Sequence, residues 1–177
     1  MPAIIIKRDS IWRKGGWHLK SSLSPSAEKV QSSLYEAGYN YQVIELSQTT
    51  RSAQEAAQAV GCQVGQIVKS LIFRAKESNR AILVVASGQN RVNETRIASL
   101  LGEPIEKADA EFVREKTGFA IGGVPPLGHK FRLEAFVDED LLKYDVVWAA
   151  AGTPNAVFAL SPSDLVKMTG GRVISIK

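Results

Sequence analysis

The hydrophobic positions follow two spacings in turn along the chain, and this pattern predicts alternating helices and strands. Ser24 followed by Pro25 is typical of a helix start, and apolar residues at helical spacing continue to Gly38. Ser52 and Glu55 form a capping box that opens an alanine-rich helix ending at Gly61. Three more helices are predicted to begin after cap residues, namely Asn93, Asp109 and Ser161.

Runs of apolar residues between these helices predict strands. They lie at 42–46, 67–75, 81–86, 131–137, 146–150 and 172–176. The polar stretch 77–80 is typical of a turn between two neighbouring strands. Because strands and helices are interleaved, without an internal repeat or linker, we expect one compact domain of the mixed α/β class.

The excess positive charge lies at one end of the sequence. The chain has 177 residues and a formal net charge of +4. Residues 1–24 contain five basic residues and one acidic residue, so residues 25–177 are neutral overall. We interpret 1–24 as a basic, poorly ordered arm and 25–177 as the folded domain. The arm either contacts nucleic-acid phosphates, with Trp12 and Trp17 available for stacking, or packs loosely without a function.

Composition also limits the chemistry. Cys62 is the single cysteine, and His18 and His129 are the two histidines, so we expect no disulfide, no metal and no cofactor. No apolar run approaches the roughly 20 residues of a membrane span, and the first residues do not form a secretory signal. We therefore expect a cytoplasmic protein with no membrane partner. Phosphate-loop, nucleophile-elbow and dinucleotide fingerprints are also absent from the sequence.

Lys69 is the first candidate for chemistry, because it interrupts an apolar strand. Along a strand it shares one face with Leu71 and Phe73, while Ser70 lies on the other face. Lysine is rarely buried without a partner. Lys69 therefore either binds a phosphate or an acyl oxygen in a recess, or extends its ammonium group from the strand into water.

Two segments rich in small residues are further candidates. The first is 122–129, in which two glycines permit unusual backbone conformations and two prolines stiffen the loop. Its main-chain groups can hold a small polar ligand, but the same residues also suit a plain tight turn. The second is 149–155, which either lines a narrow pocket or forms a packed turn.

The ordered set of these motifs resembles the YbaK / prolyl-tRNA-synthetase-associated editing domain family. The resemblance covers about residues 24–177. The segments that carry it are 50–57 (TRSAQEAA), 67–71 (IVKSL), 117–128 (TGFAIGGVPPLG), 151–152 (AG) and 160–165 (LSPSDL). Each segment is modest alone, and their order is what makes the resemblance specific.

The resemblance implies a curved mixed sheet with flanking helices. It also implies hydrolysis of the ester in a mischarged aminoacyl-tRNA, such as tRNA for proline carrying Cys or Ala. Neither a metal nor a protein nucleophile is implied. Lys69 matches the family's active-site lysine, and Gly122 to Pro126 match its G-x-x-x-P loop. The loop backbone would position the aminoacyl group for attack by water, helped by the terminal hydroxyl of the tRNA.

From this resemblance we expect Lys69 and Gly122 to be catalytic. The expected substrate-binding residues are Ser70, Gly123, Val124, Pro125, Pro126, Gly128, His129, Gly152, Thr153 and Asn155. The expected partner is the acceptor end of a mischarged tRNA, with prolyl-tRNA synthetase as a second candidate. The sequence does not indicate an oligomeric state.

One departure from the family keeps an alternative open. Some members carry Asp or His shortly after the counterpart of Gly152, where this chain has Thr153 to Phe158. Asn155 can form hydrogen bonds there but cannot act as a base. The alternative is a non-catalytic binding module of the same fold that holds a small ligand, an acceptor end or a synthetase. The order Lys69-Ser70-Leu71 is closer to the cysteine-type branch than to the alanine-type branch.

Overall fold

The computed structural model describes residues 22–48 and 50–177, and most of its helix ends are set by the expected cap residues. The helices are α1 (Pro25–Glu36), α2 (Ala53–Val60), α3 (Glu94–Leu101), α4 (Ala110–Thr117) and α5 (Pro162–Thr169). Side chains of Ser52, Asn93, Asp109 and Ser161 accept from main-chain N–H groups of the first helical turn. Ser24 makes no such bond, and its own N–H donates to the carboxylate of Glu45 instead.

Eight strands form one mixed sheet within the described residues. They are β1 (Ile44–Glu45), β2 (Ile67–Ala75), β3 (Ala81–Ser87), β4 (Ile105–Lys107), β5 (Glu134–Asp138), β6 (Val147–Ala150), β7 (Ala156–Leu160) and β8 (Arg172–Ile174). Their order is β1-β7-β6-β2-β3-β5-β8, with β4 paired to β2 outside this path. The strands β2 and β6, β3 and β5, and β5 and β8 are parallel, and the other pairs are antiparallel.

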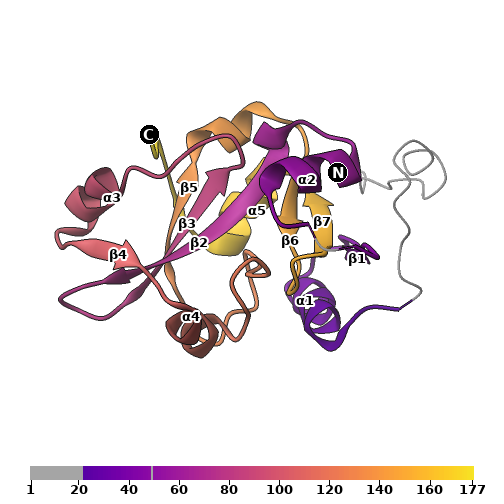
Figure 1. Cartoon of the computed structure of the whole chain (residues 1–177), viewed down its shortest axis with the longest axis horizontal. Coiled ribbons are helices and arrows are strands. Elements are labelled where there is room, and N and C mark those ends of the chain that lie inside the picture. The colour runs from indigo at the N-terminus through magenta and orange to yellow at the C-terminus, as the bar shows by residue number, and fades with distance from the viewer. Residues whose placement is uncertain (1–21, 49) are drawn as a thin grey trace.

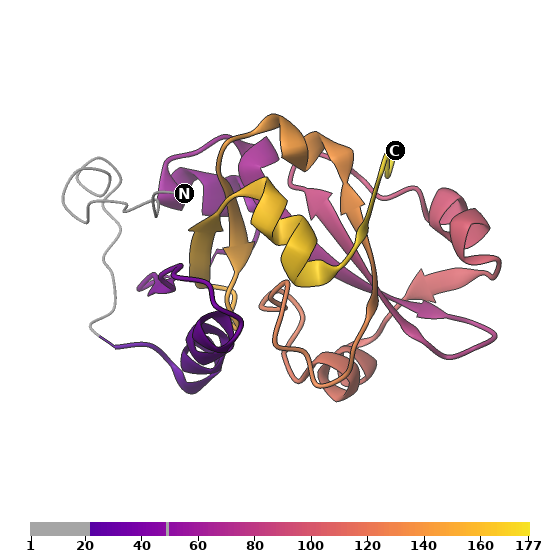
Figure 2. The ribbon, with the colours of Figure 1, turned by 180° about the vertical axis from the view of Figure 1, so that it is seen from behind.

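Helices cover both faces of the sheet (Figures 1 and 2). Figure 1 shows α2 in front of the β6–β7 end, and Figure 2 shows α5 across the opposite face. The packing of these helices forms three apolar clusters. In the first, α2 packs on Trp148 and Val157, and in the second, α3 packs on Phe73 and Phe136. The largest cluster joins α1, α4 and α5 through residues such as Phe158. The mixed α/β class expected from the sequence is thus confirmed.

The long strand β2 has two different partners along one edge. Ile67 and Val68 pair with β6, and the strand's far end, from Phe73 to Ala75, pairs with β4. The opposite edge pairs with β3 from Val68 onward. Between β6 and β4, no strand covers residues 69–72 on the first edge within the described chain. The sheet therefore has a gap at Lys69, and this gap positions the candidate site.

Several elements differ from those predicted by the sequence pattern. The strands expected at 42–46, 131–137 and 172–176 are shorter, at Ile44–Glu45, Glu134–Asp138 and Arg172–Ile174. The pattern does not predict β4 or β7. β4 is three residues long with only Ile105 buried, and it is held by pairing with β2. β7 is buried on both faces, so it lacks the alternation of a strand with one exposed face.

Residues 1–21 of the predicted basic arm lie outside the described residues. Across the rest of the chain, residue 49 aside, none of the helices has the length and apolar character needed to cross a membrane. The same described part contains no group of three or more His, Cys, Asp or Glu side chains arranged to hold a metal ion.

Candidate active site

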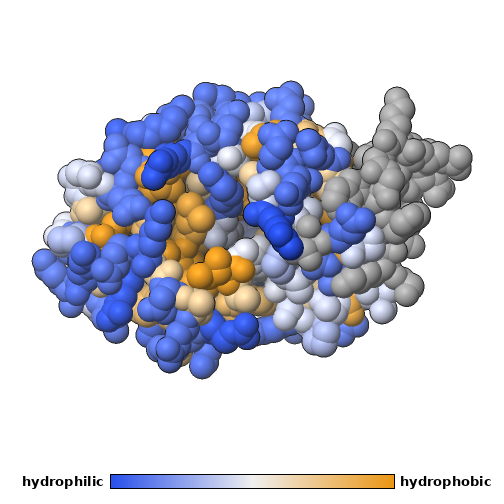
Figure 3. All heavy atoms as spheres, in the orientation of Figure 1, coloured by the Kyte–Doolittle hydropathy of each residue, from blue (hydrophilic) through white to orange (hydrophobic). Residues whose placement is uncertain are grey.

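A cleft of about 770 Å³ opens where β2 lacks a partner. Its floor is β2, and its walls come from the start of α2, the segment 90–94, the end of β4 and the loop 121–124. Val68, Leu71, Val124 and Trp148 are among the lining residues, so the cleft is mainly apolar. Figure 3 shows apolar surface gathered in a hollow between hydrophilic flanks. Such a site excludes water around a ligand and strengthens the polar contacts within it.

Lys69 lies half-buried on β2 within this cleft. Its Nζ donates to the main-chain oxygen of Asn90 at 2.5 Å. Burial lowers the pKa of Lys69, and the nearby negative charge of Asp138 opposes that shift. An ammonium group has three donors, so the bond to Asn90 leaves others for a ligand. Lys69 thus resembles the recessed binding group more than a lysine that extends freely into water.

Ser70 points to the opposite face of β2 and also lines the cleft. Its Oγ is buried and has no hydrogen-bond partner among the residues that the structure describes. A buried hydroxyl without a partner costs free energy, roughly 1–3 kcal/mol. A polar group of a ligand that reached Ser70 would recover that cost.

The loop after α4 brings Gly122 and Val124 to the cleft. Gly122 has φ +87°, which favours glycine, and a Cβ there would lie 3.7 Å from Pro154 Cγ. The Gly123 carbonyl accepts from the N–H of Gly152 at 2.8 Å. A Cβ on Gly123 would lie 2.7 Å from the carbonyl carbon of Gly152, so no larger residue fits without movement. The loop is therefore joined directly to the turn that follows β6.

Pro125, Pro126, Gly128 and His129 lie behind the loop and do not line the cleft. The Pro125 carbonyl is 2.6 Å from His129 Nε2, and burial lowers the pKa of His129. Gly128 packs against Ser33 of α1, since a Cβ on it would lie 2.7 Å from Ser33 Oγ. The contacts of Pro125, Gly128 and His129 help to hold the loop in place, and direct contact of any of the four residues with a substrate stays a prediction.

Thr153 and Asn155 are not among the residues that line the cleft. The Asn155 amide donates to the Leu46 carbonyl at 2.7 Å, and the Thr153 hydroxyl contacts Asn155 Oδ1 at 3.1 Å. Asn155 thereby ties the turn to the segment that ends β1. Pro154, between them, does line the cleft beside Gly122. Of the expected site residues, the cleft brings together Lys69, Ser70, Gly122 and Val124, with Gly123 and Gly152 directly behind.

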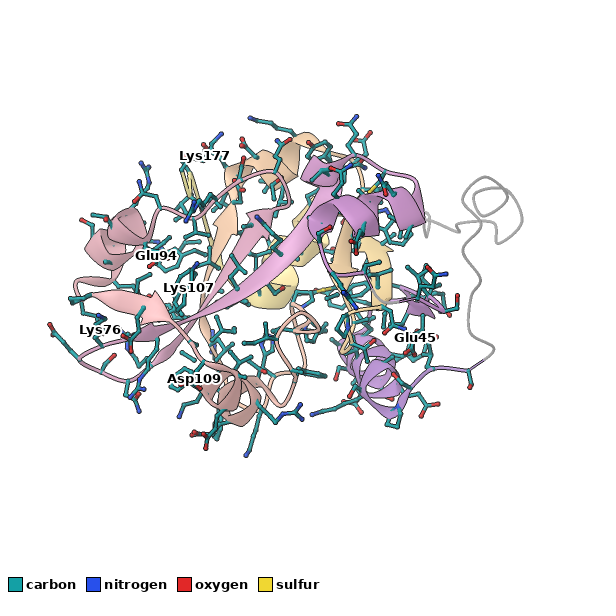
Figure 4. All side chains as sticks on the ribbon, in the orientation of Figure 1. Glu45, Lys76, Glu94, Lys107, Asp109 and Lys177 are labelled. Atoms are coloured by element: carbon teal, nitrogen blue, oxygen red, sulfur yellow. The ribbon has the colours of Figure 1, made fainter. Side chains whose placement is uncertain are left out.

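Sequence reasoning did not select three basic residues at the cleft, Arg51, Arg91 and Lys107. All three side chains are exposed, and none forms an ion pair with another described residue. Figure 4 shows Lys107 on β4 and the acidic Glu94 on α3, both of which line the cleft. For Arg91, the available signal was the basic stretch from Lys69 to Arg96, which is interrupted by only two acidic residues, whereas Arg51 and Lys107 lie outside that stretch.

Comparisons with known proteins indicate the family and the fold of this chain. A family model described as "Aminoacyl-tRNA editing domain" matches residues 47–168. A solved structure described as a "putative trans-editing enzyme for prolyl tRNA synthetase" is similar, with a TM-score of 0.85, 52% identity, and coverage of 88% of this chain and 99% of that chain.

Two sequence relatives extend the comparison. The uncharacterized protein YwhH of Bacillus subtilis (strain 168) is 30% identical over 74% of this chain and 83% of its own length. A proline–tRNA ligase of Limosilactobacillus fermentum is 34% identical over 51% of this chain and only 16% of its own length. The family match covers most of the chain and includes Lys69, the 122–126 loop and the turn after β6. The chain therefore belongs to the aminoacyl-tRNA editing domain family.

Proposed function

We propose that the protein hydrolyses the ester bond of a mischarged aminoacyl-tRNA and releases a small amino acid, such as Cys or Ala, from tRNA for proline. The observation that carries the proposal is the convergence of Lys69 and the Gly122 loop on one apolar cleft. The family match supports the reaction class. The similarity to a structure described in terms of prolyl-tRNA synthetase supports the choice of tRNA.

In the proposed reaction, Lys69 binds an oxygen of the acceptor end, and the loop backbone holds the aminoacyl group. Water adds to the ester carbonyl, and the bond between that carbon and the ribose oxygen breaks. One proton of the water goes to the leaving oxygen, and the products are the free amino acid and tRNA with a free hydroxyl. The terminal hydroxyl of the tRNA helps to orient the water. An aminoacyl ester is already activated, so positioning and electrostatic stabilisation suffice.

The arrangement after β6 supports water as the attacking group without a side-chain base. The side chains of Thr153 and Asn155 contact each other, and Asn155 also holds the Leu46 carbonyl. The position at which some family members carry Asp or His is thus used to hold the fold. The cleft lining near Gly122 includes Ile121, Val124 and Pro154, and we infer that these apolar side chains favour a small amino acid.

A deacylation panel tests the proposal. We expect the purified protein to release the amino acid from Cys-, Ala- or Ser-charged tRNA for proline, and to leave the correctly charged tRNA intact. Rates are corrected for hydrolysis of the ester without protein. Saturable binding of the charged tRNA without turnover on any member of the panel would contradict the proposal and favour the binding module.

Removal of one charge at the cleft should weaken substrate binding more than the chemical step. Arg91→Ala is expected to raise KM by about three- to tenfold with little change in kcat, because an exposed arginine near phosphates contributes about 1 kcal/mol. The salt dependence of KM should also become shallower. Lys167→Ala is the matched control, because Lys167 is an exposed cation on α5 outside the cleft. An equal change in KM for both variants would argue against contact between Arg91 and the substrate.

A further inference from the structure

A buried polar cluster lies behind Lys69, where the parallel strands β3 and β5 end. It consists of Ser87, Asn90, Asp138 and Asp140, and we call it the Asn90 cluster; all four residues are buried. The Asn90 amide donates to Asp138 Oδ2 at 2.8 Å and to Asp140 Oδ2 at 2.7 Å. Asp138 also accepts from the main-chain N–H groups of Ser87 and Asp140. Each bond lies in a buried setting, where losing a partner is costly.

The backbone that carries Asn90 has little freedom. The N–H of Gly88 donates to the Ile67 carbonyl at 2.7 Å, and the N–H of Asn90 donates to the Ser87 carbonyl at 3.0 Å. A Cβ on Gly88 would lie 2.3 Å from the Val64 carbonyl oxygen, so the loop is pressed against its neighbour. The Asn90 carbonyl, which accepts from Lys69, is therefore held from both its side chain and its main chain.

The two carboxylates of the cluster differ in whether a cation binds them. Asp140 accepts from Lys143 at 2.5 Å and from Lys177 at 2.7 Å. Among the described residues, the hydrogen bonds to Asp138 come only from neutral amide groups. Its negative charge is therefore not offset by a hydrogen-bonded cation, and it raises the pKa of Lys69 against the larger, opposite effect of burial.

We propose that Asn90 and Asp138 are positioning residues for the deacylation reaction: Asn90 fixes the carbonyl that directs the Lys69 ammonium into the cleft, and the carboxylate of Asp138 holds the Asn90 side chain and places a negative charge behind that ammonium. The inference rests on the proposed function of the cleft and adds the residues that prepare its lysine. Both act through Lys69 and need not touch the substrate. Supporting hydrogen bonds around metal ligands tune activity in the same way, by about 10- to 100-fold.

The direction of the pH effect follows from the charges around Lys69. Behind Lys69 lie Asp138 on β5 and Asp140, which binds Lys143 and Lys177. The charged residues that line the cleft are Arg51, Arg91, Glu94 and Lys107. Burial lowers the pKa of Lys69, and Asp138 raises it. Removing the charge of Asp138 should therefore lower the pKa of Lys69 further. The ammonium would then be lost at a lower pH as the pH rises.

The pKa of Lys69 can be measured without substrate, by NMR titration of its Cε signal in the full chain. We expect Asp138→Asn to lower this pKa, because the variant removes the negative charge that opposes the effect of burial. Lys177→Ala is the matched control, because Lys177 touches Asp140 but neither Asn90 nor Lys69. An unchanged pKa in Asp138→Asn would overturn the role of Asp138. A shift of the Lys69 pKa of equal size and direction in the control variant would also overturn the role of Asp138.

Kinetics test the positioning role of Asn90. Asn90→Ala and Asp138→Asn are expected to lower kcat by about tenfold with KM within about twofold, because they disturb the lysine and not the substrate contacts. Circular dichroism confirms the fold of each variant, and Asn90→Ser replaces Asn90→Ala if the latter does not fold. Wild-type kcat in folded Asn90 variants would overturn the inference. Failure of the wild-type protein in the whole panel would instead overturn the proposed function, while the NMR titration would still test the cluster.

Discussion

Lys69→Ala is expected to lower the rate of deacylation by about 100- to 1,000-fold, the usual effect of removing one preorganised donor from a catalytic site. The ammonium of Lys69 is held at the floor of an apolar cleft by the Asn90 carbonyl. In that setting, its attraction for an oxygen of the acceptor end is much stronger than in water. The measurement is single-turnover hydrolysis of a mischarged tRNA that the wild-type protein accepts.

A matched control separates this loss from a general loss of positive charge. Lys107→Ala removes an exposed cation from the same cleft, at the end of β4. It should change KM more than kcat and leave the single-turnover rate near that of the wild type. Lys69→Arg should not restore the rate, because the larger, planar guanidinium presents its donors in a different geometry from the compact ammonium. Equal rates for Lys69→Ala and wild type would exclude the mechanism.

Gly123→Ala is expected to lower the free energy of unfolding by about 2–3 kcal/mol and to remove most of the activity. The reason is that the structure leaves no room for a side chain at position 123. The added Cβ would lie 2.7 Å from the carbonyl carbon and oxygen of Gly152 and 2.8 Å from Thr153 Cα, all of them backbone atoms. The loop must then move away from the turn and break the bond between the Gly152 N–H and the Gly123 carbonyl. Chemical denaturation and the deacylation rate together measure this prediction.

Gly170→Ala is the control for the general effect of replacing a glycine. Gly170 ends α5 with φ +60°, and a Cβ there would meet nothing within 4 Å. Its replacement should cost about 1 kcal/mol through backbone conformation alone and leave the activity unchanged. If Gly123→Ala matched Gly170→Ala in both measurements, the close packing of the loop would not matter for the site.

The helices were the most predictable part of the fold, because caps act within one turn of the chain. Ser52 bonds to the N–H of Glu55, and the Gly61 cap is left-handed, as the sequence pattern indicates. β4 and β7 were not predictable, because long-range pairing creates them. The gap in β2 could not be predicted either, since it depends on where β6 ends and β4 begins along the same edge.

Some residues of the candidate site could likewise be predicted from the sequence, and others could not. Lys69 could be selected from sequence because a charged residue in an apolar strand is unusual. Asn90 and Asp138 could not, because they lie 48 residues apart and each is an ordinary polar residue near a strand end. Thr153 and Asn155 were selected by their place in the family motif, but their hydrogen bonds with each other and with Leu46 appear only in three dimensions.

The β3 and β6 partners of β2 close loops of different length when they pair, and this difference favours an order of folding. β2 and β3 are joined by a short turn, so the pairing of Phe73 with Ile82 closes only a small loop. The pairing of Ile67 with Trp148 closes a much longer loop, and the larger entropic cost of closing that loop slows the formation of this pair. The floor of the cleft, β2, is therefore expected to form early with the β2–β3 hairpin, and the side lined by Trp148 only when β6 docks. A partly folded chain has the lysine on its strand but no enclosed site in which to use it.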